Sequence, residues 1–190
     1  GHVDLVLSAG DLPMEYLSYI VTALNKPLLF VFGNHNLKEL PYYRPNLNPD
    51  PGPTFAHDYA RDQGATYVGF KIRREAGLIV MGLGGSLRYN AGQNQFTQLQ
   101  MWLRVLAKVP ALALNRLVFG RAVDVVLTHA PPRGLQDRED PCHRGFEAFL
   151  WLMRVWKPRY LIHGHVHLYD SREARTTAYG RTTVMNAYGY

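Results

Sequence analysis

The sequence predicts a layered α/β fold, and two patterns support that prediction. Five short runs rich in Val, Ile, Leu and Phe each stop at a polar or glycine-containing loop, and they cover residues 3–7, 28–32, 78–83, 123–127 and 160–162. Continuous apolar runs of this length are typical of strands that are buried on both faces. Segments with helical periodicity lie between them, so we expect either helices packed on one sheet or a sandwich of sheets with helices outside.

Three of the intervening segments are predicted to be helices, and they cover residues 13–24, 93–106 and 145–156. The first has Pro13 near its first turn, a position that tolerates the missing N–H. The second is amphipathic, and one of its sides carries Phe96, Leu99, Trp102, Leu103 and Leu106. Five prolines in residues 41–53 predict an irregular loop, and residues 182–190 predict one more strand or hairpin arm.

Composition limits the classes of protein to consider. The 190 residues are enough for one globular domain, which we expect to span residues 1–190. No stretch approaches the roughly 20 apolar residues of a membrane-spanning helix, so we expect no membrane partner. The single cysteine, Cys142, excludes an internal disulfide, and without a signal-peptide pattern we expect a cytoplasmic protein. The sequence does not indicate an oligomeric state.

The formal net charge of +6 favours an anionic partner. The cations are scattered along the chain rather than gathered in a run, so nucleic acid is possible but not favoured. A small phosphate ester is the partner we expect.

Side chains that can bind metals follow four of the five predicted strands. They are Asp11, Asn34 with His35, His129, and the pair His165 and His167. The carboxyl ends of strands in layered α/β folds meet at one edge, so these side chains are expected to converge. A mixed set of oxygen and nitrogen donors suits Mn, Fe or Zn and does not suit Ca.

Taken together and in this order, these motifs resemble the calcineurin-like metallophosphoesterase family. The family run is D-x-H, then G-D, then G-N-H-D/E, then a single His, then G-H-x-H. The chain matches the last four blocks with Gly10-Asp11, Gly33-Asn34-His35, His129 and Gly164-His165-Val166-His167. The resemblance implies a two-sheet β-sandwich flanked by helices, in four layers α/β/β/α. It also implies hydrolysis of a phosphodiester or phosphomonoester by a metal-bound hydroxide.

The resemblance also assigns roles to individual residues. It implies two divalent metal ions (Mn, Fe or Zn) bridged by the Asp11 carboxylate. Asn34, His129 and His165 would be the remaining ligands of one ion, and His167 would be a ligand of the other. His35 resembles the histidine that does not bind metal but contacts the substrate phosphate and helps to protonate the leaving alkoxide.

The first family block, D-x-H, has no counterpart in the sequence. Asp11 lies close to the first residue, and His2 and Asp4 occur in the reverse order. We therefore expect the second metal site to be incomplete and the domain to lack its first strand. Either the chain begins late, or the protein is a degenerate family member with poor hydrolysis. A non-catalytic metal-binding interaction module on the same fold is an alternative function. A nuclease is a further alternative, supported only by the positive charge.

Two loops are candidates for substrate binding. His143 and Arg144 lie in a charged loop before the third predicted helix, and Arg88 and Asn90 follow a pair of glycines. Arginine offers a planar pair of donors that matches a phosphate. The alternative for the first loop, an ordinary charged surface segment, stays open. His163 is predicted to be structural, His57 to lie at the surface, and Cys142 not to be a nucleophile.

Overall fold

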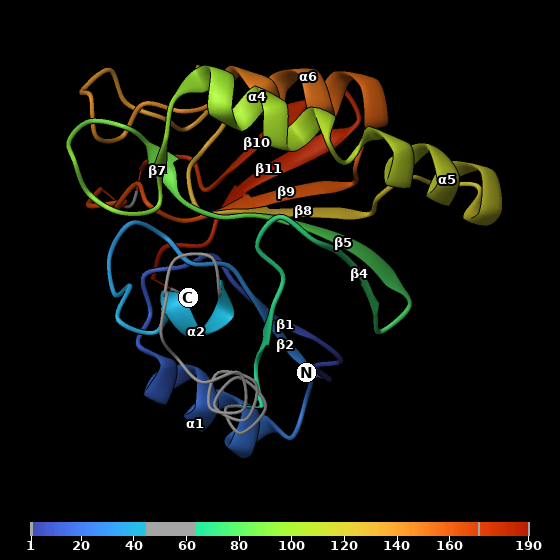
Figure 1. Ribbon diagram of the computed structural model, residues 1–190, viewed down its shortest axis with the longest axis horizontal. Coiled ribbons are helices and arrows are strands. Elements are labelled where there is room, and N and C mark those ends of the chain that lie inside the picture. The colour runs from blue at the N-terminus through green and yellow to red at the C-terminus, as the bar shows by residue number, and fades with distance from the viewer. Residues whose placement is uncertain (1, 45–63, 171, 190) are drawn as a thin grey trace.

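The computed structural model describes residues 2–44, 64–170 and 172–189. Its elements form four layers (Figure 1). One outer layer holds helices α1 (Met14–Leu24) and α2 (Leu40–Tyr43), and the other holds α4 (Gln98–Leu106) and α6 (Glu147–Trp156). Two sheets lie between them, so the predicted two-sheet sandwich flanked by helices is confirmed.

The sheet next to α1 has three parallel strands in the order β1 (Val6–Ser8), β2 (Leu28–Phe30) and β3 (Thr66–Tyr67). The larger sheet has the order β10 (Thr176–Tyr179), β11 (Thr182–Asn186), β9 (Tyr160–His163), β8 (Val125–Thr128), β5 (Leu78–Leu83) and β4 (Ile72–Glu75). Strands β5, β8, β9 and β11 are parallel to their neighbours within this group, whereas β4 and β10 pair antiparallel at the two edges. A short parallel pair, β6 (Ser86–Leu87) and β7 (Gln95–Phe96), follows β5.

Alternation along the strands divides the buried side chains among three cores. In and just after β2, Phe30 and Phe32 pack towards α1, whereas Leu29 and Val31 pack between the two sheets. In β8, Val126 joins the core beneath α4 and α6. Strands β2, β5 and β8 read as continuous apolar runs because both of their faces are covered.

The five predicted strands are present as β1, β2, β5, β8 and β9, and β11 forms the predicted hairpin arm with β10. The predicted helix over 93–106 is wrong at its start, because Gln95–Phe96 is a strand. Helix α4 begins after Thr97, whose side chain accepts from the Gln100 N–H while the Gln100 side chain accepts from the Thr97 N–H. This capping box was readable in the sequence as T-x-x-Q.

The apolar side expected for this helix is not the one that packs inwards. Met101 and Val105 are fully buried, whereas Leu99, Leu103 and Leu106 are exposed. Helix α5 (Val109–Phe119), which the sequence analysis missed, extends beyond the end of the larger sheet (Figure 1). It has a proline in its first turn.

The proline-rich segment 41–53 is only partly described. Its first residues belong to the short helix α2, and the predicted loop over 45–53 lies outside the described residues, as does His57. In the described part of the chain, no helix combines the length and the hydrophobicity needed to cross a membrane.

Candidate metal centre

The loops after β1, β2, β8 and β9 meet at one edge of the sandwich. Backbone hydrogen bonds join these loops: the Gly164 N–H donates to the carbonyl of His129 at 3.0 Å, and the Val31 N–H donates to that of Ser8 at 3.2 Å. The Gly85 N–H, after β5 in the larger sheet, donates to the carbonyl of Phe32 in the smaller sheet at 2.8 Å. The edge therefore gathers residues that are far apart in sequence, as expected for carboxyl ends of strands.

Four of the predicted site residues come together around Nε2 of His129. This nitrogen lies 3.0 Å from Oδ1 of Asn34, 3.1 Å from Nδ1 of His165 and 3.3 Å from Oδ2 of Asp11. The donor atoms of Asp11, His129 and His165 all lie within 4.8 Å of one another. His129 and Asn34 are buried, and Asp11 and His165 are half-buried.

Backbone carbonyls set which nitrogen of each imidazole faces the centre. Nδ1 of His129 lies 2.7 Å from the carbonyl oxygen of Ala9, and Nε2 of His165 lies 2.6 Å from that of Cys142. A carbonyl can only accept, so each of these outer nitrogens carries a hydrogen and donates it. When the rings are neutral, Nε2 of His129 and Nδ1 of His165 carry lone pairs that face each other. Histidines that bind metals are oriented in the same way, by donating their other N–H to an outer partner.

The side chain of Asn34 is oriented by Tyr89, which was not among the candidates predicted from the sequence. The Asn34 amide nitrogen donates to the hydroxyl of Tyr89 at 3.0 Å, which leaves its oxygen facing His129. Tyr89 lies in the glycine-containing loop where Arg88 and Asn90 were the candidates. A further missed residue, Asn94, donates to the carbonyl of Phe32 and supports the loop that carries Asn34. No sequence pattern marks either residue.

The donor atoms at this point suit a bound cation. Burial alone would raise the pKa of Asp11, but contact with His129 and the His35 N–H lowers it to about 2, so the carboxylate is ionised. Burial, and then the nearby His129, lower the pKa of His165 to about 3, so this ring is neutral. With both rings neutral, the four inward-facing atoms would all be acceptors, and only a proton or a metal ion satisfies them. A carboxylate, an amide oxygen and two imidazoles fit a divalent transition metal.

The backbone at the centre is unusual in two respects. Asp11 and His165 have φ values of 60° and 66°, in the left-handed region that residues other than glycine rarely adopt. Gly33 packs so closely against Asp11 and His129 that a side-chain Cβ there would collide with both. The loops hold this geometry against a local cost, which is common at functional sites.

His35 lies beside the centre without being one of its inward-facing donors. Its backbone N–H donates to Oδ1 of Asp11 at 2.9 Å, and the Asn36 side chain donates to the Asp11 carbonyl. The imidazole of His35 is exposed and has no hydrogen-bond partner among the described residues. A ring held at the rim of the centre and open to solvent can exchange protons with a bound ligand.

His167 lies outside the cluster of donor atoms. Its Nδ1 is 2.9 Å from the hydroxyl of Tyr169, and its ring stacks on Tyr188 with centroids 4.3 Å apart. The structure therefore brings together the four residues expected to bind one metal ion but does not bring His167 to them. Among the described residues, no group of metal donors includes His167, which was predicted to bind the second ion.

The structure places the four residues predicted to bind substrate in different surroundings. The ring of His143 lies 5.2 Å from that of His165, next to the centre. Arg144 donates to the carbonyl of Glu139. Arg88 donates to Gln95 and Gln100, and the Asn90 side chain accepts from Gln95 and the Gly92 N–H, so both hold their own loop together.

Asp140, Cys142 and His143 form a second group of possible metal donors within 4.8 Å of one another. Oδ1 of Asp140 accepts hydrogen bonds from the Cys142 thiol and the His143 N–H, and it lies 2.9 Å from Nδ1 of His143. The three side chains are therefore close together because they hydrogen-bond to one another within a single turn. The hydrogen bond to Asp140 raises the pKa of Cys142, which opposes a role as nucleophile. His163 is buried and lies 2.8 Å from the Gln136 oxygen, in a structural position.

A comparison with protein families matches residues 1–169 to the calcineurin-like phosphoesterases. None of the curated proteins compared with the chain matches it.

Solved structures resemble the chain at low sequence identity. TT1561 of Thermus thermophilus is 12% identical with a TM-score of 0.59, and the match covers 97% of this chain and 76% of that one. The phosphopantetheinyl hydrolase PptH of Mycobacterium tuberculosis is 16% identical with a TM-score of 0.55, and the match covers 96% and 78% of the two chains. A third crystal structure is 18% identical with a TM-score of 0.56; the match covers 91% of this chain and spans only 63% of that one. These likenesses show the shared fold.

Proposed function

The chain belongs to the calcineurin-like phosphoesterase family, and from that premise we propose that it hydrolyses a small phosphodiester or phosphomonoester at the edge that carries Asp11 and His129. The family supports metal-dependent phosphoester hydrolysis in general. The finer proposal rests on one observation: oxygen or nitrogen atoms of Asp11, Asn34 and His165 lie within 3.3 Å of Nε2 of His129.

Asp11, Asn34, His129 and His165 would hold one divalent ion, with Mn, Fe or Zn the metals that their donor atoms suit. When bound, such ions lower the pKa of water and neutralise the charge of a phosphoryl group. His167 is kept as a ligand of the second ion of the pair on family grounds. Its exposed ring contacts Tyr169 and Tyr188 and is not part of the group around His129.

The protein's own residues account for the remaining steps. The ionised Asp11, the neutral His165 ring and the buried His129 fix the position of the centre. The exposed His35 ring would then donate a proton to the leaving alkoxide of the ester, a role that general acids perform at a gain of roughly 10² to 10⁴ in rate. The proposed substrate contact nearest to the centre is His143, whose ring packs 5.2 Å from that of His165.

Two variants separate the proposed roles. His35→Ala should retain the bound metal and lose most hydrolysis of bis(p-nitrophenyl) phosphate, whereas His129→Ala should lose both. Metal content is measured by elemental analysis and hydrolysis by the released nitrophenolate. An unchanged rate in His35→Ala would remove that residue as the acid.

The same assay tests the alternatives. If purified protein loaded with Mn, Fe or Zn shows no hydrolysis above a His129→Ala control, the non-catalytic metal-binding module is favoured. A nuclease is the second candidate, supported by the net charge of +6. It predicts cleavage of polynucleotides that weakens steeply with salt, because polyanion binding releases counterions.

A further inference from the structure

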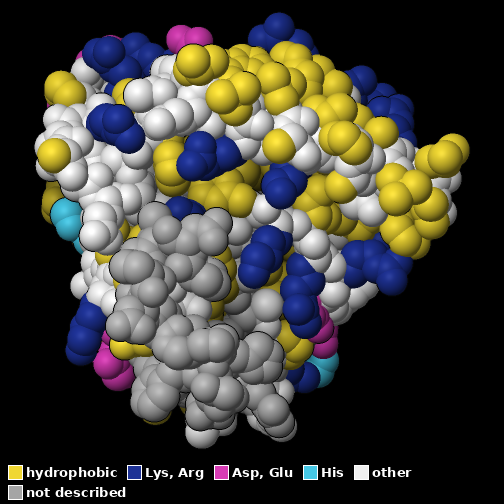
Figure 2. All heavy atoms as spheres, in the orientation of Figure 1, with side chains coloured by type: hydrophobic (Ala, Val, Ile, Leu, Met, Phe, Trp, Pro, Cys, Tyr) yellow, Lys and Arg dark blue, Asp and Glu magenta, His cyan; other side chains and the backbone are white. Residues whose placement is uncertain are grey.

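The outer surface of helices α4 and α5 is apolar to an unusual degree. Seven exposed side chains form this surface, which we call the α4–α5 face: Leu99, Leu103, Leu106, Leu114, Leu117, Val118 and Phe119. Leu117 is 83% exposed, and of the large side chains that line the core, α5 contributes only Leu112. Figure 2 shows hydrophobic side chains spread over the region where Figure 1 places α4 and α5. Exposed apolar surface of this kind marks an interaction site.

The sequence segment that carries this face contains no acidic residue. Between Glu75 and Asp124 the sequence contains no Asp or Glu, and its cations are Arg88, Arg104, Lys108, Arg116 and Arg121. Arg116 lies on α5 itself, and Lys108 lies between the two helices. Leucine on one side of a helix with basic residues beside it is typical of helices that lie in a membrane interface.

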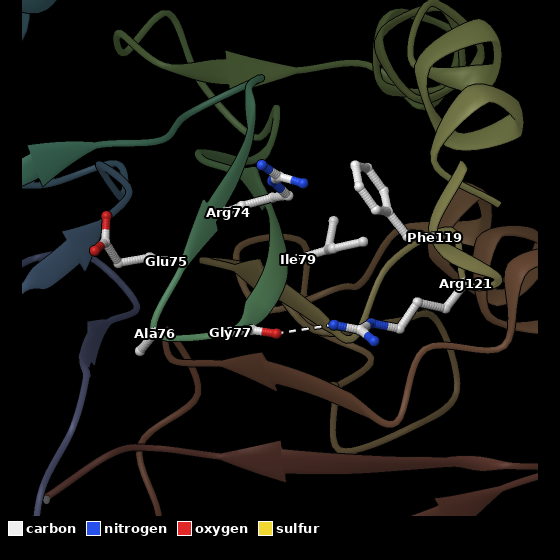
Figure 3. Close-up of a pocket in the computed structure, with 7 residues that line it drawn as sticks. All are labelled: Arg74, Glu75, Ala76, Gly77, Ile79, Phe119 and Arg121. Carbon is white, nitrogen blue, oxygen red and sulfur yellow. Dashed lines mark hydrogen bonds between the residues drawn. The ribbon is translucent and has the colours of Figure 1, made fainter. Parts of the chain in front are cut away.

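A cavity of about 410 Å³ adjoins the end of α5 and adds the guanidinium group of Arg74, whereas that of Arg121 is paired with Asp124 at 2.9 Å. Figure 3 shows Arg74 from β4 and Phe119 from α5 lining this cavity, with Arg121 nearby. The guanidinium of Arg74 lies 4.5 Å from the ring centre of Phe119 and has no carboxylate partner among the described residues. The one acid in the lining, Glu75, is paired with Arg73 at 3.1 Å. The cavity is therefore suited to a phosphate.

We propose that the α4–α5 face docks on the surface of an anionic phospholipid membrane. The leucines of α5 enter the interface, and headgroup phosphates contact Arg74 and Arg116. The turn between β4 and β5, which lines the cavity, and the end of α5 lie at the end of the larger sheet opposite the loops that carry the candidate metal centre (Figure 1), so docking leaves that centre accessible. The expectation of no membrane partner rested on the lack of a spanning segment, and a protein bound at the surface needs none.

A second copy of the chain is a poorer occupant of the same face. A two-fold contact places the same patch on both sides, so the cations of one copy would face those of the other. An anionic lipid surface supplies the opposite charge and accepts apolar side chains between its headgroups.

Vesicle sedimentation tests the proposal with phosphatidylcholine alone and with a mixture of phosphatidylcholine and phosphatidylglycerol. We expect the protein to bind the mixed vesicles at least about tenfold more strongly. Leu114→Asn with Leu117→Asn should reduce this binding by about tenfold, as should Arg74→Glu with Arg116→Glu. The control Leu24→Asn removes an exposed leucine on α1, in the opposite layer, and should bind like the unaltered protein.

Circular dichroism melting confirms that each variant is folded, and the two double variants test the apolar and charged contributions independently. Equal binding to both kinds of vesicle, or no binding, would overturn the proposal. So would light scattering that shows a dimer in solution which Leu114→Asn with Leu117→Asn converts to a monomer. That last result would assign the face to a second copy. None of these outcomes depends on phosphoester hydrolysis.

Discussion

Nε2 of His129 faces Nδ1 of His165 at 3.1 Å, although the two residues lie 36 positions apart in sequence. Each ring donates its other N–H to a backbone carbonyl, from Ala9 and Cys142 respectively. If both rings are neutral, two lone pairs face each other at this distance and repel unless a proton or a metal ion lies between them. The loops thus hold donor atoms together at a point where a cation would fit.

Metal binding should stabilise the folded protein. Because the unfolded chain does not gather these donors, adding Mn or Zn at roughly 100 times the dissociation constant should raise the free energy of unfolding by about 2.7 kcal/mol. Differential scanning calorimetry with and without chelator measures the effect. Asp11→Asn should lose most of it, whereas Asp4→Asn, a change at an exposed carboxylate, should keep it. An equal metal effect in both variants would contradict the proposed ligand.

Gly33→Ala should disrupt the centre by steric conflict. The added Cβ would meet the Asp11 carboxylate and the His129 ring, so we expect loss of metal binding and a stability cost of about 1–3 kcal/mol. Gly164→Ala is the matched control, because its Cβ would meet Ala9 only at 3.4 Å, an ordinary contact. Isothermal titration with Mn compares the two variants, and normal affinity in Gly33→Ala would show that the site is looser than the structure indicates.

Tyr89→Phe should weaken metal binding without unfolding the protein. Loss of the hydroxyl leaves the Asn34 amide free to rotate, which should lower metal affinity by about tenfold, in the range typical of groups that orient ligands. Tyr16→Phe, on an exposed side chain of α1, serves as the control. The melting temperatures of both variants should match that of the unaltered protein. If affinity is also unchanged, Tyr89 does not orient Asn34.

Stability in the metal-free protein should fall as the solution becomes acidic. Burial lowers the pKa of His163 from 6.5 to about 4, so the unfolded chain takes up a proton that the folded chain refuses. The contribution of neutral His163 to the free energy of unfolding is complete above pH 6.5 and is lost as the pH falls towards 4. It amounts to roughly 3 kcal/mol. Urea unfolding in chelator across this range measures it. His163→Gln should reduce the dependence and leave the part that comes from His165, whose pKa is also lowered, whereas His2→Gln, at an exposed position, should leave it unchanged.

Much of the fold and the metal-donor residues of the site were predictable from the sequence because they depend on local sequence patterns. Strands buried on both faces appear as apolar runs, which located β1, β2, β5, β8 and β9. Where local signals compete, prediction failed: the strand at Gln95–Phe96 was merged into the helix that follows. The sequence also placed Leu99, Leu103 and Leu106 together on one side of a helix but could not tell that this side faces outwards.

By itself the sequence determined the residue types at the strand ends and their order, and with them the family and the identity of Asp11, Asn34, His129 and His165 as candidates. Only the tertiary structure decided that these four converge while His167 lies against Tyr188. It also revealed Tyr89 and the carbonyls of Ala9 and Cys142 as the groups that orient them. The physical reason is that hydrogen-bond partners and exposure depend on how distant loops and layers pack, which local sequence patterns do not encode.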